Sequence, residues 1–306
     1  MRIAVRGGTI ASLRADRSLL ALALLTGGVT LAALVCLLSS PAAFVDEPTG
    51  HRPLAAVQDV RGRATKHVLV VSHAAGFGHS SIPLGTQIIQ ELGQKQGLWE
   101  TDVAVDAAAV TQKLAGEFLK GVDLVIFNNA TGELPISEEG KAAFLQWLRA
   151  GHGFVGVHAA TDTFYKWGDY GKMIGGYFDG HPWHQKVTVR VEDKKFPGVQ
   201  SLGDSFEITD EIYQFRDWTR DNLHVILSID NASLDVTKGK RADNDYAVAW
   251  ARMEGKGRVF YTSLGHREDV WTDPRYQEHL LGGIRWALGL ARAKVKPGTR
   301  PGAAEK

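Results

Sequence analysis

A histidine directly follows a predicted buried strand in the stretch from Gly151 to Asp162. The apolar residues from Phe154 to Val157 predict a short strand, and the small residues around His158 permit a sharp turn into the next segment. Ligands bind at the carboxyl ends of strands in open α/β sheets, so this position favours a functional imidazole. The alternative is a structural histidine whose nitrogens bond to neighbouring backbone.

Other histidines and acids fall on segments that the same sheet edge would bring together. The loop after an expected strand at 67–73 carries His73 and His79, and the loop after the last expected strand carries His266 and Glu268. Two further segments are expected to close over them, and they contain His181, Trp183, Asp210, Glu211 and Tyr213. Imidazoles and acids in one crevice can perform acid–base catalysis or bind a divalent metal such as zinc.

Each of these residues has an expected role. The candidate catalytic residues are His158, His266, Glu268 and Asp162. The candidate substrate-binding residues are His79, His181, Trp183, Asp210, Glu211 and Tyr213. The candidate metal ligands are His79, His158 and His181. We favour acid–base chemistry with an optional metal, because no HExxH-like pair fixes two ligands on one helix.

Aromatic residues lie close in sequence to these segments, which suits a sugar ligand. Sugar C–H faces stack on flat rings while the hydroxyls form hydrogen bonds. The rings in question are Trp167, Tyr170, Trp183, Tyr213 and Trp271. Core packing is the competing interpretation, and it is the one we expect for Trp147, Trp250 and Trp286.

Buried-strand patterns alternate with helical patterns over the first half of the domain. Strands are predicted at 67–73, 101–106, 122–127 and 154–157, and helices at 82–94, 110–119 and 137–151. This alternation predicts an α/β fold with a doubly wound, mostly parallel sheet and helices on both faces. Later strands at 185–191, 206–215 and 225–229, and a hairpin of 246–250 with 258–264, predict an antiparallel extension. A last helix is expected at 274–290 and a shorter one at 165–177.

The amino-terminal segment differs in composition from the rest of the chain. Residues 1–43 combine four arginines with an apolar run from Leu19 to Leu38 and small residues after it. This order is typical of a signal peptide, although the run is also long enough for a membrane anchor. Residues 44–65 are expected to be a linker, 66–292 the folded domain and 293–306 a disordered tail. We therefore expect an extracytoplasmic domain, periplasmic or secreted, that contacts the membrane only through its amino-terminal segment.

Composition excludes some classes of function. The 306 residues carry a net charge of +1, of which the leader contributes +3, so the remainder has no basic excess for nucleic-acid binding. The single cysteine, Cys36, lies in the leader. The domain therefore has no disulfide, thiolate metal ligand or cysteine nucleophile.

Five motifs resemble the trehalose-utilisation (ThuA-like) family. They lie at 78–82, 153–162, 175–182, 210–213 and 257–266, and the run through His158 is the most specific of them. The resemblance covers about residues 66–290. It implies a flavodoxin-like domain related to class I glutamine amidotransferases. It also implies a role in sugar catabolism that is often linked to 3-keto-glycosides made by partner sugar dehydrogenases.

The amidotransferase comparison is informative where it fails. Those enzymes carry a cysteine at a strand-to-helix elbow and a His-x-Glu pair after a later strand. Here His158 stands at the elbow, while His266 and Glu268 keep the His-x-Glu spacing. Cysteine-dependent glutaminase chemistry is therefore excluded. The leading hypothesis is a lyase, isomerase or hydrolase acting on trehalose or a keto-glycoside. The alternative is a non-catalytic sugar-binding module with a degenerate crevice, which would have less need of two imidazoles.

Overall fold

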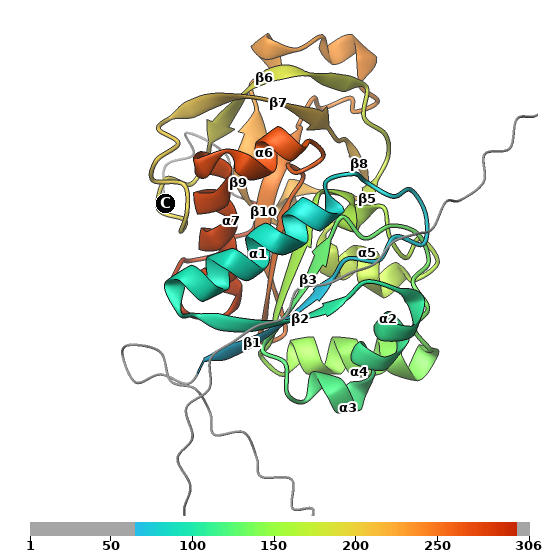
Figure 1. Ribbon diagram of the computed structural model, residues 1–306. Helices are drawn as coiled ribbons and strands as arrows, with labels where there is room; N and C mark the ends of the chain where they lie inside the picture. The colour runs from blue at the N-terminus through green and yellow to red at the C-terminus, as the bar shows by residue number, and fades with distance from the viewer. Residues whose placement is uncertain (1–64, 299–306) are drawn as a thin grey trace, which may run out of the picture. The chain divides into compact units, whose positions relative to one another are not determined.

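The computed structural model describes residues 65–298, so the expected leader and most of the expected linker lie outside the described residues. A nine-stranded sheet runs through this part of the chain in the order β2-β1-β3-β4-β11-β10-β9-β6-β7 (Figure 1). Its strands are β1 (Lys66–Val71), β2 (Trp99–Ala104), β3 (Leu124–Asn128), β4 (Gly153–Val157), β6 (Trp183–Val191), β7 (Ser205–Ile212), β9 (His224–Ile229), β10 (Ala247–Glu254) and β11 (Gly257–Thr262).

Half of the sheet is parallel. Strands β2, β1, β3, β4 and β11 form a parallel series in that order. The inner strands β1, β3 and β4 are apolar runs, because helices cover both faces of this half. Residues Val68, Leu69, Val70 and Val71 of β1, for example, are all fully buried. The mostly parallel α/β fold predicted from the sequence is confirmed.

The other half is antiparallel. Strand β10 pairs antiparallel with both β11 and β9, and β6 pairs antiparallel with both β9 and β7. The turn at Gly255, which has a φ of 61°, connects β10 to β11 as the Gly-Lys-Gly sequence predicts. A separate ribbon of β5 (Tyr177–Phe178) and β8 (Phe215–Arg216) lies over the carboxyl edge. The predicted antiparallel extension is therefore also confirmed.

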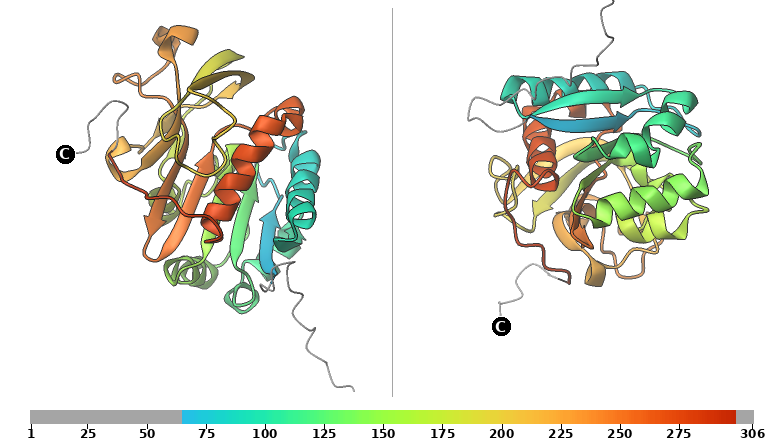
Figure 2. Two further views of the ribbon diagram at one scale, coloured as in Figure 1. Left: turned by 90° about the vertical axis from the view of Figure 1, so that its left-hand side faces the viewer. Right: turned by 90° about the horizontal axis from the view of Figure 1, so that it is seen from below.

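Helices form a layer on each face of the sheet, as the two turned views show (Figure 2). One face packs against α1 (Ile82–Gln96) and α7 (Pro274–Ala287), and the other against α2 (Ala107–Lys113), α4 (Glu138–Arg149) and α5 (Gly168–Ile174). Two short helices, α3 (Gly116–Leu119) and α6 (Glu268–Thr272), complete the set. This arrangement leaves the carboxyl ends of the parallel strands open to their connecting loops.

Several boundaries differ from the sequence prediction, and three of the differences have a clear physical reason. The helix expected at 110–119 is two helices, because Asp106 accepts a hydrogen bond from Ala109 and begins α2 early, while α3 is a separate turn. The helix expected at 165–177 stops at Ile174, where Gly175 takes a φ of 105°. Residues 293–298 pack against the core through Val295, so the ordered chain extends past the boundary expected at 292. In the described range 65–298, no helix is long and apolar enough to cross a membrane.

Candidate active site

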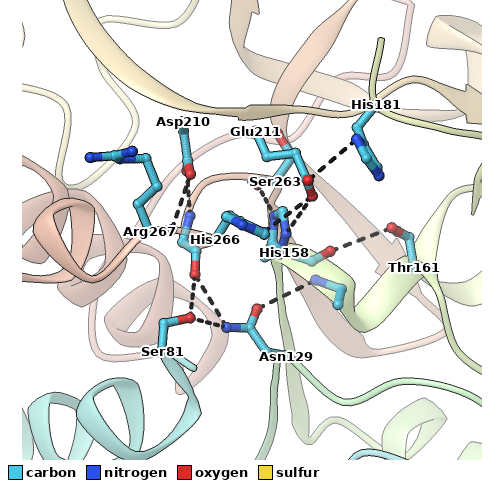
Figure 3. A network of polar contacts seen from close by, with 12 residues as sticks. Ser81, Asn129, His158, Thr161, His181, Asp210, Glu211, Ser263, His266 and Arg267 are labelled. Carbon is cyan, nitrogen blue, oxygen red and sulfur yellow. Dashed lines mark hydrogen bonds and ion pairs between the residues drawn. The ribbon is translucent and has the colours of Figure 1, made fainter. Parts of the chain in front are cut away.

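Four side chains converge at the carboxyl edge of the parallel strands. His79 follows β1, His158 follows β4, Glu211 lies near the end of β7 and His266 follows β11. One nitrogen or oxygen from each lies within 4.8 Å of the others. Figure 3 shows His158, His266 and Glu211 pointing toward one another. The structure thus joins three histidines that the sequence placed on separate loops, and we call these four residues the histidine cluster.

The backbone at His158 turns sharply to direct its ring into the cluster. Its φ of 45° is left-handed, which is uncommon for any residue except glycine. The ring is fully buried, and Nδ1 lies 2.6 Å from the carbonyl oxygen of Ser263. That contact assigns the proton to Nδ1, so Nε2 carries a lone pair. Nε2 lies 3.4 Å from Oε2 of Glu211 but has no hydrogen-bond partner.

The other two imidazoles of the cluster also hold a buried nitrogen without a hydrogen-bond partner, namely Nδ1 of His79 and Nδ1 of His266. Burial lowers the pKa of His79 to about 3, with a further contribution from the neighbouring histidines, so this ring is neutral near pH 7. Nδ1 of His266 lies 3.2 Å from Oε2 of Glu211, and the direct polar contact with this carboxylate, together with its charge, raises the pKa of His266.

The carboxylate of Glu211 is the charged member of the cluster. Burial alone would raise the pKa of Glu211, but the imidazoles of His158 and His266 hold it well below its usual range. Glu211 is therefore ionised near neutral pH. It faces the lone pair of His158, and two acceptors facing each other at this distance repel unless a cation or a proton lies between them.

This donor set fits a divalent metal ion. Buried polar atoms normally have partners, and three unpartnered imidazole nitrogens in one place require an explanation. Three imidazole nitrogens and one carboxylate oxygen are ligands that Zn²⁺ accepts in a tetrahedral site. The sequence predicted His79, His158 and His181 as metal ligands. The group in the structure contains His79 and His158, and it is completed by Glu211 and His266 and not by His181.

Buried polar contacts hold the loop of His266 in place. Asp210 is fully buried and accepts hydrogen bonds from the backbone N–H groups of Gly265 (2.7 Å) and Arg267 (3.2 Å). Burial raises the pKa of Asp210. Both Asp210 carboxylate oxygens bond to this loop, so this residue positions His266, and the substrate-binding role predicted for it does not match its location.

A second set of contacts joins three loops beneath the cluster (Figure 3). Asn129 has a φ of 51°, and its Nδ2 donates to Oγ of Ser81 (3.0 Å) and to the carbonyl of Gly265 (3.2 Å). Ser81 also donates to Gly265 (3.1 Å). Sequence reasoning missed this role of Asn129. The available signal was the polar pair Asn128-Asn129 that ends an otherwise apolar strand.

Other polar groups lie beside the cluster. Nδ1 of His181 lies 3.3 Å from Oε1 of Glu211, and the His181 side chain is 49% exposed. Asp162 accepts a 2.5 Å hydrogen bond from the Tyr165 hydroxyl, and burial raises the pKa of Asp162. Tyr213 is buried with its ring 4.2 Å from the ring of His158, so it forms a wall of the cluster.

Two predicted site residues lie elsewhere. Trp183 is 1% exposed, donates its Nε1–H to the carbonyl of Asp235 and packs against Tyr246, so it is a core residue and not a sugar-binding ring. Glu268 is exposed at the first position of α6, and the acidic member of the cluster is Glu211 instead. A His-x-Glu spacing does not determine which way each side chain points.

Most of the large rings near the site form the core. Tyr170 and Trp271 are fully buried, so the expectation that they bind sugar is wrong. The core positions expected for the other tryptophans are confirmed, and these are Trp147, Trp250 and Trp286. Phe77, by contrast, is an exposed ring beside the cluster: it is 65% exposed, and its ring centre lies 4.9 Å from that of His79.

The fold and the site together define a class of protein. It is a doubly wound α/β domain with an amidotransferase-like strand-to-helix elbow, in which an imidazole replaces the thiol and further imidazoles and a carboxylate surround it. Residues 67–287 match the model of the ThuA family, described as trehalose utilisation, and the chain belongs to this family.

Solved structures agree with this assignment. A ThuA-like protein from Bacteroides uniformis is 22% identical with a TM-score of 0.59, over 77% of this chain and 95% of that one. A ThuA-like protein from Parabacteroides merdae is 17% identical with a TM-score of 0.58, over 78% and 95%. At these identities the likeness shows the fold alone. No curated protein matches the chain.

Proposed function

We propose that the chain is an enzyme that uses a divalent metal ion, such as zinc, to act on a keto-sugar. The observation that carries the proposal is the convergence of four ligand atoms within 4.8 Å, three of them imidazole nitrogens. The ligands would be His79, His158, Glu211 and His266. When bound, such an ion supplies Lewis acidity toward a carbonyl oxygen. Membership of the trehalose-utilisation family supports a sugar as the substrate.

His181 is suited to move a proton at the substrate. Its Nδ1 faces Glu211, and half of its side chain is exposed to solvent, where a substrate has access. A carbonyl group acidifies the C–H bond beside it, so a neutral imidazole can remove that proton. The C–H electron pair then forms the enolate. This assigns general base catalysis to His181, whereas the sequence predicted it for His158.

Asp162 is suited to the complementary step. Burial raises the pKa of Asp162, and a carboxyl group in its protonated form can donate a proton. In a keto-glycoside whose glycosidic carbon is β to the carbonyl, the enolate electron pair forms a carbon–carbon double bond as the glycosidic C–O bond breaks. Asp162 would protonate the departing oxygen. The net reaction moves one proton from carbon to oxygen and needs no oxidant. The oxidation that makes the ketone would be a separate, earlier reaction of a partner dehydrogenase.

The test combines metal analysis with turnover. Purified full-length protein is analysed for bound metals and incubated with 3-keto-trehalose and unoxidised trehalose, with products followed by mass spectrometry. We expect about one divalent ion per chain, cleavage of the keto-sugar only, loss of turnover with a chelator and recovery with Zn²⁺. Equal turnover by metal-free protein would contradict the proposal.

A non-catalytic sugar-binding module is the second candidate, and the exposed ring of Phe77 beside the cluster favours sugar binding of either kind. The same experiment separates the two. Saturable sugar binding without any product, at full metal occupancy, would support the binding module.

We also propose that the domain is exported, either after cleavage of the leader or while anchored by it. The support is the basic and apolar composition of residues 1–43, which lie outside the described residues. Cell fractionation tests this, and full-length protein in the cytoplasm would contradict it. Sequencing the mature amino terminus distinguishes cleavage from anchoring.

A further inference from the structure

A hollow lies near the histidine cluster, and we call it the side pocket. Its volume is about 330 Å³, near the lower end of the range for small-molecule sites. It is lined by Tyr165, Phe178, Asp179, Gly180, Arg216 and Lys240. These residues come from the segment before α5, from the β5–β8 ribbon and the loop after β5, and from the loop before β10. None of them belongs to the cluster.

Ring contacts connect the side pocket to the cluster. The Phe178 ring lies 5.7 Å from the His181 ring in a stacked arrangement and 4.4 Å from Tyr213. Tyr213 in turn contacts His158. On the same side, the Tyr165 hydroxyl donates to Asp162. The proposed base and acid therefore lie between the cluster and the side pocket, which is where a bond between two parts of a substrate would be cleaved.

The walls of the side pocket combine flat rings with fixed polar groups. The Arg216 guanidinium carbon lies 4.9 Å from the centre of the Tyr165 ring, a cation–π contact that fixes its position. Nζ of Lys240 bonds to both the carboxylate and the carbonyl of Asp179, each at 2.9 Å, so that its charge is balanced. Rings and hydrogen-bonding groups without a strong excess of one charge suit a polyhydroxylated ring.

We infer that the side pocket binds the second sugar ring of a glycoside whose keto-sugar ring lies at the histidine cluster. The enzyme would therefore prefer a keto-disaccharide to a keto-sugar with a small substituent. The volume is sufficient for one sugar ring. Arg216 is the specificity residue in this scheme, because among the described residues no ion pair engages its guanidinium, which leaves its N–H groups available for sugar hydroxyls. This inference rests on the proposed function.

The experiment uses a pair of ligands that differ only in the second ring, 3-keto-trehalose and methyl 3-keto-α-glucoside. Affinity and kcat/KM are measured for both with the full-length wild type, with Arg216→Met and with the control Arg190→Met. Arg190 is an exposed arginine on β6 that pairs with Asp230. Loss of one or two hydrogen bonds to the second ring should lower affinity and kcat/KM for the disaccharide about tenfold in Arg216→Met. The methyl glycoside values and the Arg190→Met protein should stay within about twofold of wild type.

Three outcomes would overturn the inference: equal affinity of wild type for both ligands, an equal loss on both ligands in Arg216→Met, or no loss on the disaccharide. A wild type that binds both ligands but converts neither removes the proposed reaction, and the affinity comparison still decides the side pocket. If Arg216→Met fails to fold, Lys240→Met replaces it with the same expected discrimination. A keto-disaccharide whose second ring is a uronic acid is tested in the same way. If it binds more tightly than 3-keto-trehalose, and Arg216→Met removes this gain, the second ring that the side pocket prefers is acidic and not neutral.

Discussion

Two clusters of buried polar residues in this domain differ in whether their hydrogen bonds are satisfied. Arg220 lies between Glu192 and Asp245 and donates two hydrogen bonds to each, at 2.5 to 3.1 Å. The histidine cluster contains a comparable number of ionisable groups, but three of its buried nitrogens have no hydrogen-bond partner.

The difference separates a structural group from a functional one. The guanidinium of Arg220 faces two carboxylates in bidentate geometry, so no capacity remains for a ligand. The cluster keeps unpartnered nitrogens in a group of candidate ligand atoms within 4.8 Å of one another, and its backbone holds His158 in a left-handed conformation. Unsatisfied buried groups and backbone strain both reduce stability, so they persist where function requires them. The predictions below test this distinction.

The largest expected effect is on the cluster. His158→Asn should reduce bound metal well below one per chain and lower turnover at least about 10²-fold, because asparagine tolerates a positive φ but lacks the imidazole lone pair. Metal analysis and turnover on 3-keto-trehalose measure this, and circular dichroism should show an unchanged fold. His152→Asn is the matched control, because His152 stacks on Trp147 away from the cluster. Full metal content in His158→Asn would show that the histidine cluster is not the metal site.

The satisfied group should respond in the opposite way. Arg220→Met leaves Glu192 and Asp245 buried without their partner, which should cost about 3–5 kcal/mol of folding free energy. Metal content per folded chain should not change. Urea denaturation measures the loss, and Arg190→Met, which breaks an exposed pair, should cost no more than about 1 kcal/mol. A stable Arg220→Met protein without metal would reverse the assignment of the two groups.

A buried histidine outside the cluster tests whether unsatisfied nitrogens alone mark a site. His279 on α7 is 1% exposed, neither ring nitrogen has a hydrogen-bond partner and the ring packs against Phe260. Burial lowers the pKa of His279 to about 4. The one group of converging candidate ligands among residues 65–298 does not include His279, so we expect His279 to be structural.

This prediction has a definite sign. The folded pKa of His279 lies below the unfolded value of about 6.5, so its contribution to stability is complete above pH 6.5 and decreases as the pH falls toward 4. Between pH 7 and pH 5 the wild type should lose about 2 kcal/mol more than His279→Leu. Denaturant unfolding of both proteins at the two pH values measures this. Identical pH dependence would show that His279 accepts its proton in the folded state.

The sequence predicted the parallel half of the fold well, because strands buried on both faces read as apolar runs such as Val68 to Val71. It also placed His79, His158 and His266 at the correct edge, since strand ends follow from strand positions. It did not predict that Glu211 belongs with them or that Glu268 does not. Side-chain direction near the end of β7 depends on register with β6, a long-range property. The burial of Trp183 escaped prediction for the same reason.

The smallest expected effect concerns the ring at the rim of the cluster. Phe77 is 65% exposed between Gly76 and Gly78, and its edge contact with His79 is the ring contact that connects it to the site. An exposed apolar ring contributes little to folding, whereas stacking on a sugar contributes about 0.5–1.5 kcal/mol. Phe77→Ala should therefore raise KM for 3-keto-trehalose about 2- to 10-fold, with kcat, metal content and stability unchanged. Phe77→Trp should restore the wild-type KM.

Met253→Ala is the control, because Met253 is also exposed but lies on β10 next to the turn at Gly255. If Phe77→Ala lowers metal content instead, the ring supports the cluster and does not bind the sugar, and the boundary of the functional region must then be drawn to include this loop.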